Sequence, residues 1–282
     1  MKRIVIFLIA LLVIAFTVTF SACSFDADSN DNKSNAAEKE TLLEFEEEIL
    51  NNTENTAEVG ADNSEEETTD LFSRVDILLK ASISGLSVRS APNSTSSVIG
   101  SLDKGDLVAF MGEENGWYTT VYKEKRGYVS AKYCEVLQFS KGEDRIEKVI
   151  EEGKKLLGYP YVWGSQRYHW GNGILNTAFV EGKYDCSALM QYIFYKTDKT
   201  LLGVTSREQA AQVRKLDRAS LQRGDLMFFT NSSRKNLTGI ERVGHVGLYL
   251  GNNYILHTAS DYACIEEISA TRWSYFMWGG RV

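Results

Sequence analysis

Short segments of alternating apolar and polar residues follow one another between residues 79 and 138, and turn-forming residues separate them. Alternation with a period of two is typical of strands that bury one face. The strands predicted in this way are Leu86–Arg89, Val98–Leu102, Leu107–Met111, Trp117–Tyr122 and Gly127–Ser130. A series of short strands in a range of this length favours a small β-barrel.

Beyond residue 143 the apolar residues recur every three or four positions, which indicates helices. A first predicted helix carries the apolar residues Ile146, Val149, Ile150, Leu156 and Leu157. Ser140 and Glu143 predict a capping box at its start. Gly158 and Pro160 end it, because neither residue continues a helix readily.

A second predicted helix follows Tyr184, and it carries the apolar residues Leu189, Met190, Ile193 and Phe194. Asp185 is suited to its N-cap position, which leaves Cys186 in the first turn. The N–H groups at a helix N-terminus stabilise a thiolate, as does a neighbouring imidazole. Cys186 is therefore a candidate nucleophile, although a buried structural cysteine would fit the same place.

Residues 243–250 and 254–259 are two predicted strands with turn-forming residues between them. A three-residue loop places Gly247 opposite His257, so that His245 and His257 share a face within side-chain reach. A two-residue loop would put the two histidines on opposite faces. In the preferred register the other face carries Val246, Leu248, Leu250, Tyr254 and Leu256.

A cysteine at a helix start, followed along the chain by histidines on strands, is the order that a papain-like nucleophile needs. The predicted roles are Cys186 as nucleophile, His245 as base and His257 as the residue that orients the base. A zinc site formed by the same three side chains is an alternative, but the close ligand pair common in metal sites is absent. We expect neither a metal ion nor a cofactor.

The first 23 residues have a basic start, Lys2-Arg3, and an apolar run that ends at Phe20, as in a signal peptide. The ending Phe20-Ser21-Ala22-Cys23 resembles a bacterial lipoprotein box, with Phe20 where leucine is usual. The resemblance implies cleavage before Cys23 and a lipid anchor on it. An uncleaved anchor or plain secretion are the alternatives, and all three place the rest of the chain outside the membrane.

Residues 24–78 are assigned to an acidic, disordered tether. Between residues 24 and 72, sixteen Asp and Glu stand against two Lys, a net charge of −14, whereas the whole chain has −7. Such a stretch repels itself and has little apolar surface to bury. The remainder is mildly basic, which suits an anionic cell wall, and it contains no nucleic-acid-binding motif.

Several blocks in the second half resemble the signature blocks of NlpC-type cell-wall peptidases. The blocks are Tyr161-Val162-Trp163-Gly164, Asp185-Cys186-Ser187, Thr205-Ser206-Arg207-Glu208-Gln209, Gly224-Asp225-Leu226-Met227-Phe228-Phe229, Gly244-His245-Val246-Gly247-Leu248-Tyr249-Leu250-Gly251 and Ile255-Leu256-His257. The resemblance covers residues 143–282. It implies a papain-like fold and cleavage of the peptide stems of bacterial peptidoglycan, typically after γ-linked D-glutamate.

The same resemblance implies roles around the nucleophile. Tyr161 would help to hold the oxyanion, and Trp163 would contact the substrate. Asp185 and Ser187 stand where some relatives bind the free amine of a stem's N-terminal L-alanine. Ala188 departs from the family, which usually has glycine after the serine.

The stretch between Trp163 and Asp185 is longer than we expect in this family, and residues 165–183 form an aromatic, glycine-rich insertion. It would be either a cleft wall that selects substrates or a surface loop packed on itself. His169 lies in this insertion and receives no catalytic role. Cys134 and Cys264 fall in different predicted domains, and we expect both to be buried free thiols.

The strand segments of residues 79–138 resemble a bacterial SH3-like domain. The blocks that carry this resemblance are Leu86–Pro92, Lys104–Asp106, Asn115–Tyr118 and Gly127–Val129. In the family such domains accompany wall hydrolases and bind the wall or shape the rim of the active site. A spacer that binds nothing is the alternative.

The sequence thus predicts an α+β protein in which a small SH3-like β-barrel precedes a papain-like cysteine peptidase domain. We expect a Cys-His-His endopeptidase of the bacterial cell wall, held at the outer face of the membrane. A wall amidase, an acyl transferase and a non-catalytic wall-binding lipoprotein are the alternatives. The sequence leaves open whether the substrate contains diaminopimelate or lysine.

Overall fold

Two sheets form the first half of the folded chain in the computed structural model, which describes residues 74–258 and 261–282. The described residues belong to the second of two compact units, residues 65–282. The signal peptide, its Cys23 and nearly all of the tether therefore lie outside the described residues. Strand β1 (Val75–Ala81) pairs antiparallel with β4 (Leu107–Ala109) on one side and β8 (Cys134–Ser140) on the other.

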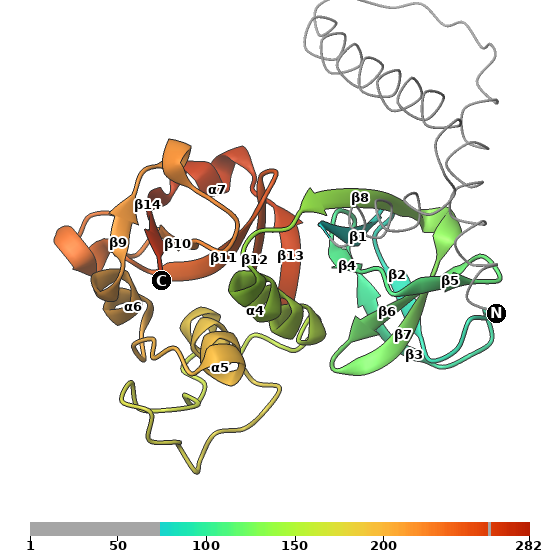
Figure 1. Ribbon diagram of the computed structural model, residues 1–282, viewed down its shortest axis with the longest axis horizontal. Helices are drawn as coiled ribbons and strands as arrows, with labels where there is room; N and C mark the ends of the chain where they lie inside the picture. Colours follow the sequence, from blue (N-terminus) through green and yellow to red (C-terminus); the bar gives the residue numbers. More distant parts are fainter. Residues whose placement is uncertain (1–73, 259–260) are drawn as a thin grey trace, which may run out of the picture. The chain divides into compact units, whose positions relative to one another are not determined.

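The other sheet of this half has five strands (Figure 1). Their order is β3 (Val98–Leu102), β2 (Leu86–Arg89), β7 (Lys125–Ser130), β6 (Trp117–Tyr122) and β5 (Gly112–Glu114). A 3₁₀ turn, η1 (Ala131–Tyr133), leads into β8. All five predicted strands are present. The sequence missed β1, β5 and β8, and β1 begins inside the range that we assigned to the tether.

The second half contains the sheet that positions the candidate site. Its strand order is β13 (Ala263–Glu267), β12 (Tyr254–Thr258), β11 (His245–Gly251), β10 (Leu226–Phe229), β14 (Phe276–Arg281) and β9 (Arg214–Leu216). Every pairing in it is antiparallel. Short 3₁₀ turns, η2 (Arg218–Ser220) and η3 (Gly239–Arg242), connect the strands.

Four α-helices accompany this sheet in the described ranges. They are α4 (Asp144–Lys155), α5 (Cys186–Asp198), α6 (Ser206–Gln212) and α7 (Ala270–Ser274). The predicted capping box at the start of α4 is wrong. Ser140 ends strand β8, and the carboxylate of Glu147 accepts the N–H of Gly142 at 2.7 Å instead. No helix in the described part of the chain is long and apolar enough to span a membrane.

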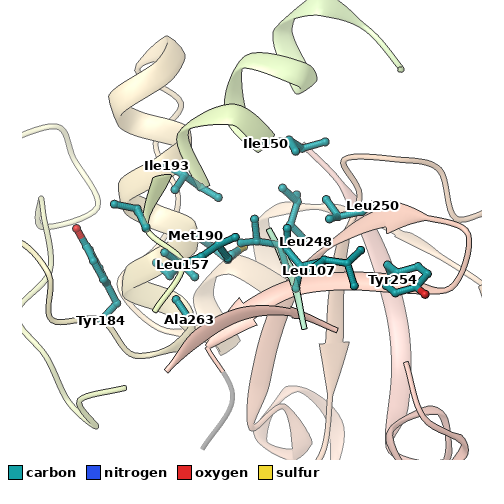
Figure 2. Close-up of a cluster of buried hydrophobic side chains, with 14 of the residues drawn as sticks. Leu107, Ile150, Leu157, Tyr184, Met190, Ile193, Leu248, Leu250, Tyr254 and Ala263 are labelled. Carbon is teal, nitrogen blue, oxygen red and sulfur yellow. The ribbon is translucent and has the colours of Figure 1, made fainter. Parts of the chain in front are cut away.

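Helix α5 packs on β11 and β12 and also contacts α4. Figure 2 shows this core, in which Met190 and Ile193 of α5 lie with Leu248 of β11. The residues that we predicted to fill one face of the hairpin β11–β12 are all buried there. Burial on both sides of α5 fixes the position of its first turn relative to β11, and the candidate nucleophile lies in that turn.

The loop of the β11–β12 hairpin differs from the prediction. Asn252 and Asn253 form a two-residue turn with φ values of 49° and 67°, and Gly251 pairs with Tyr254. A bulge between Tyr249 and Gly251 inserts one extra residue into β11. The bulge offsets the shorter turn, so the two histidines still share a face.

Buried charges join β1 to the second half. Asp76 accepts hydrogen bonds from Lys154 and from Arg223, both at 2.7 Å, and Arg223 also binds Glu147. The side chains of Asp76, Lys154 and Arg223 are each at most 7% exposed. A second contact joins the hydroxyl of Tyr262, at the start of the segment leading into β13, to the carboxylate of Asp106 at 2.7 Å.

Candidate active site

Cys186 is the first residue of α5, where the local sequence places its thiol against β11. The side chain of Asp185 caps the helix by accepting the N–H of Ala188 at 2.9 Å. The backbone N–H groups of Val246 and Ser187 lie close enough to the Cys186 sulfur to lower its pKa, against the larger effect of burial. Since Val246 follows His245 directly, the thiol lies beside the strand that carries the predicted base.

The two predicted histidines are hydrogen-bonded to each other. His245 Nε2 lies 2.8 Å from His257 Nδ1, and the two rings are nearly perpendicular, with an interplanar angle of 77°. His257 is fully buried, whereas His245 is half-buried. The prediction that the two rings lie within reach of each other is therefore confirmed.

Two further side chains, which sequence reasoning missed, extend this pair. Glu266 Oε1 lies 3.1 Å from His257 Nε2 and also accepts a hydrogen bond from Arg272 at 2.8 Å. Glu266 is on β13, two residues beyond Cys264, which faces His257 across the strands. The alternation of β13 puts Glu266 on the same face as Cys264, but only the pairing of β13 with β12 brings that face to the histidines.

The hydrogen bonds determine the tautomers. An ionised carboxylate only accepts, so the His257 proton that faces Glu266 must be on Nε2. His257 Nδ1 then accepts a hydrogen bond from the Nε2–H of His245. His245 Nδ1 is left unprotonated, and it is the lone pair available to take a proton from a thiol.

The same surroundings keep the resting groups neutral. Burial raises the pKa of Cys186 to about 11, and the nearby Asp185 carboxylate adds to the effect. Burial lowers the pKa of His245 well below its ordinary value, and His257 lowers it further. Burial also lowers the pKa of His257, against the opposing effect of Glu266. These shifts favour a neutral thiol and neutral imidazoles, whereas we expected the helix N-terminus to stabilise the thiolate.

Asp185 and Ser187 face the guanidinium of Arg167. Arg167 Nη2 donates to Asp185 Oδ2 at 2.8 Å and to the Ser187 hydroxyl at 3.2 Å. Asp185 Oδ1 accepts the Ser187 hydroxyl as well as the capping N–H. Both carboxylate oxygens therefore already accept hydrogen bonds, and a substrate amine would have to share Oδ2 with Arg167.

Tyr161 lies beside the nucleophile because it forms an isolated parallel bridge with Tyr184, two residues before Cys186. Burial raises the pKa of Tyr161, and so does the charge of an ionised Cys186. Its phenol thus stays protonated and can donate a hydrogen bond next to the sulfur. Trp163 is 85% exposed, so its indole is open to solvent and to a large substrate.

A cavity of about 580 Å³ adjoins His245 and Tyr161. It extends along Phe229 of β10 and reaches Arg272 of α7. We call the hydrogen-bonded series His245, His257, Glu266 and Arg272 the relay. The cavity beside it is large enough for part of a peptide.

The side chains that could hold a zinc ion differ from the set that we considered, Cys186, His245 and His257. Among residues 74–258 and 261–282, the one group able to hold a metal ion is His257, Cys264 and Glu266, whose ligand atoms lie within 4.8 Å of one another. It contains neither Cys186 nor His245. Arg272 bonds the same Glu266 oxygen and places a positive charge against this group.

The insertion of residues 165–183 packs largely on the outer side of α5. Tyr168 contacts the rings of Phe179, Tyr192 and Tyr195 at centroid distances of 5.0, 5.1 and 5.7 Å. His169 is fully buried against Tyr195, and burial lowers its pKa. These contacts favour the packed loop among the two interpretations of the insertion, although Arg167 connects it to the site.

The remaining cysteines of the described chain are Cys134 and Cys264. Cys134 is half-buried, and burial raises its pKa to about 12. Cys264 is buried beside His257. Neither forms a disulfide.

Two family models match the chain. The NlpC/P60 family model matches residues 158–282, and the bacterial SH3 domain model matches residues 84–135. Both matches confirm the resemblances that the sequence blocks indicated, as they confirm the mixed α and β architecture.

Curated relatives are similar at modest identity. A probable endopeptidase p60 from Listeria grayi is 30% identical over 132 residues, which cover 46% of this chain and 22% of that protein. A gamma-D-glutamyl-L-lysine dipeptidyl-peptidase from Bacillus subtilis (strain 168) is 26% identical over 171 residues, which cover 60% of this chain and 50% of that protein. The chain thus spans half the length of these relatives or less.

A solved structure of an NlpC/P60 family protein from Bacillus cereus ATCC 10987 is also similar. The two chains are 18% identical, and the match covers 77% of this chain and 66% of that one, with a TM-score of 0.39.

Proposed function

Because the chain carries an NlpC/P60 domain behind a bacterial SH3 domain, we propose that it is a cysteine endopeptidase that hydrolyses the peptide stems of peptidoglycan. The observation that carries the proposal is the hydrogen-bonded His245–His257 pair next to a cysteine in the first turn of a helix. Relatives named for endopeptidase and dipeptidyl-peptidase activity support it.

In the proposed reaction His245 Nδ1 takes the proton of Cys186 as the sulfur attacks the scissile carbonyl. The proton then passes from His245 to the leaving amine, and a thioester remains on Cys186. A water molecule, deprotonated by the same imidazole, hydrolyses the thioester. We propose that the base removes the thiol proton during attack rather than beforehand, because burial raises the pKa of Cys186 and lowers that of His245.

The oxyanion of each tetrahedral intermediate needs donors beside the sulfur. The first N–H groups of a helix have no intrahelical acceptor, so the Cys186 N–H is free for this use within α5. The Tyr161 phenol supplies the second donor. We propose Asp185, Ser187 and Trp163 as substrate contacts, with Arg167 sharing the first two.

We further propose that cleavage falls after γ-linked D-glutamate and before the diamino acid. The name of the Bacillus subtilis relative, which refers to a gamma-D-glutamyl-L-lysine bond, supports this choice. We also propose that the chain acts at the cell wall. The lipid on Cys23 and the part of the acidic tether up to residue 73 stay predictions, since both lie outside the described residues.

The test is incubation of the purified chain with defined stem peptides, followed by mass spectrometry of the fragments. Wild-type protein should release a fragment ending in γ-D-glutamate. Cys186→Ala and His245→Ala should each lose nearly all activity, and the double variant should be little worse, because the two residues act as a unit. His257→Ala should retain more activity, since His257 acts through His245.

Cys134→Ala is the matched control for loss of a thiol away from the relay, and it should remain active. Cleavage that persists in Cys186→Ala would refute the mechanism. Binding of wall fragments without cleavage by the wild type would instead favour a non-catalytic wall-binding protein. Fragments cut between a sugar and the first stem residue would point to an amidase.

A further inference from the structure

The cavity beside His245 has an unusual distribution of charge. Among the described residues that line it, Arg272 is the only one with a permanently charged side chain, and no carboxylate is among them. The Arg272 side chain is 27% exposed, so it is reachable from the cavity. Arg272 is paired with Glu266, but no carboxylate faces it from the lining of the cavity, so its remaining donors can attract an anionic group.

Two threonines that line the cavity have buried hydroxyls without a partner. Thr230 and Thr258 are 7% and 1% exposed, and the side-chain oxygen of each makes no hydrogen bond. Both residues line the cavity. A buried hydroxyl without a partner costs free energy, and that cost is recovered when a ligand accepts a hydrogen bond from it.

Arg272 can serve a ligand and its protein partner together. Its Nη2 donates to Glu266 on one side. A guanidinium has five N–H donors, so others remain for a group in the cavity. Arginine binds carboxylates well because its donors match the spacing of the two oxygens.

We propose that this cavity binds a carboxylate that the substrate carries next to the scissile bond, with Arg272, Thr230 and Thr258 as its donors. The proposal rests on the proposed function and names the substrate feature that it would select. A stem offers such a group on either side of the bond. One is the α-carboxylate of γ-linked D-glutamate, and the other is the side-chain carboxylate of diaminopimelate.

Four synthetic peptides distinguish these two sources. They combine D-glutamate or its α-amide, D-isoglutamine, with diaminopimelate or lysine in the pattern L-Ala-γ-D-Glu-diamino acid. Calorimetric binding to the full chain carrying Cys186→Ser measures recognition without turnover. One comparison sets D-glutamate against D-isoglutamine, and the other sets diaminopimelate against lysine. In one of the two we expect the peptide with the extra carboxylate to bind at least about tenfold more tightly, as for hydrogen bonds to a charged group. The comparison that shows the preference identifies the carboxylate.

Variants then assign the preference to the cavity. Arg272→Gln should bring the acid-to-amide ratio of dissociation constants close to one. Thr230→Val and Thr258→Val should each lower the ratio without lowering the melting temperature, because the hydroxyls have no partner to lose. Arg218→Gln is the matched control. The Arg218 guanidinium stacks on Trp273, which is on α7 like Arg272, at 3.7 Å from the ring centre. Arg218 does not line the cavity.

Equal binding of all four peptides by the Cys186→Ser chain would overturn the proposal. So would a preference that survives both Arg272→Gln and Thr230→Val, since Arg272 would then act only through Glu266. Turnover by the wild-type chain separates this inference from the proposed function. Selective binding without any cleavage would refute the endopeptidase while leaving the carboxylate site in place.

Discussion

Cys186 has a raised pKa, and His245, on the neighbouring strand β11, has a lowered one, which together have a measurable consequence. A thiol reacts through its thiolate, so a raised pKa keeps the resting thiol unreactive at neutral pH. The pKa of Cys186 is raised to about 11. Its thiolate fraction therefore grows about tenfold for each pH unit below that value.

We expect the rate of Cys186 alkylation by iodoacetamide in the free protein to rise continuously from pH 6 to pH 9. The experiment follows the labelled peptide by mass spectrometry. Cys134→Ser removes the half-buried thiol away from the site as a source of signal. A rate that reaches a plateau below pH 7 would show a preformed thiolate–imidazolium pair and contradict the neutral resting site.

Glu266 acts on the reaction through the tautomer of His257. Glutamine in its place can donate as well as accept, so Glu266→Gln no longer holds the proton on His257 Nε2. We expect kcat to fall on the order of 10²-fold with KM little changed, less than for a carboxylate that bonds the base directly. Nitrogen NMR of the imidazoles should show mixed tautomers, and Glu266→Asp should restore part of the activity.

Glu267→Gln is the matched control, because Glu267 is the next residue on β13 and its side chain is 57% exposed. It should behave like the wild type. Full activity of Glu266→Gln with unchanged imidazole spectra would remove Glu266 from the relay.

At this scale the sequence predicted which residues come together but not all of them. Cys186, His245 and His257 could be predicted because each stands in a recognisable local pattern. Glu266 and Arg272 could not, since their roles depend on the pairing of β12 with β13 and on the placement of α7. The neutral state of Cys186 was missed because burial outweighs the N–H groups around the sulfur.

The β11–β12 hairpin is the element that sets the distance between the two histidines. Gly247 lies on β11 opposite His257, and a Cβ atom there would lie 2.9 Å from His257 Cβ and 2.6 Å from Ile255 Cδ1. Neither contact is tolerated without movement, so glycine is required for the close approach of the strands.

We expect Gly247→Ala to lower kcat/KM by at least about tenfold, since small displacements of catalytic groups are costly. The melting temperature should fall by a few degrees, as is typical of overpacking by about 1–3 kcal/mol. Gly142→Ala is the control, because a Cβ there meets only a Glu147 oxygen at 3.6 Å. Wild-type kinetics for Gly247→Ala would show that the hairpin does not limit the relay.

Element prediction succeeded where the pattern was local. The alternation of β2, β3 and β6 predicted those strands with their observed bounds. Strand β1 was missed because its central residues, Leu78 and Leu79, are both buried, which breaks the alternation. The two-residue turn and the bulge before it were missed because each shifts the register by one residue, in opposite directions. Together they leave the hairpin side chains on the faces that a three-residue loop predicts.

At the scale of the whole described chain, the buried carboxylate of Asp76 joins segments that are distant in the sequence. It comes from β1 and bonds Lys154 at the end of α4 and Arg223 in the loop before β10. No sequence pattern predicts such a contact, since the partners lie 78 and 147 residues away. Removing one member of a buried ionic network leaves the others unpaired in a dry environment.

Asp76→Ala should therefore lower the free energy of unfolding by about 3–5 kcal/mol. Burial alone would raise the pKa of Asp76, but Lys154 and Arg223 together lower it below its ordinary value. The stabilisation is thus complete above the unfolded pKa near 4 and is lost as the pH falls through the lower folded value. Urea unfolding of wild type and variant from pH 3 to pH 8 should give a constant difference in unfolding free energy above about pH 5 that shrinks below pH 4.

Glu152→Ala, which breaks the partly exposed pair with Lys155, is the control and should cost less than about 1 kcal/mol. A difference for Asp76→Ala no larger than that of this control would show that the buried network does not stabilise the fold.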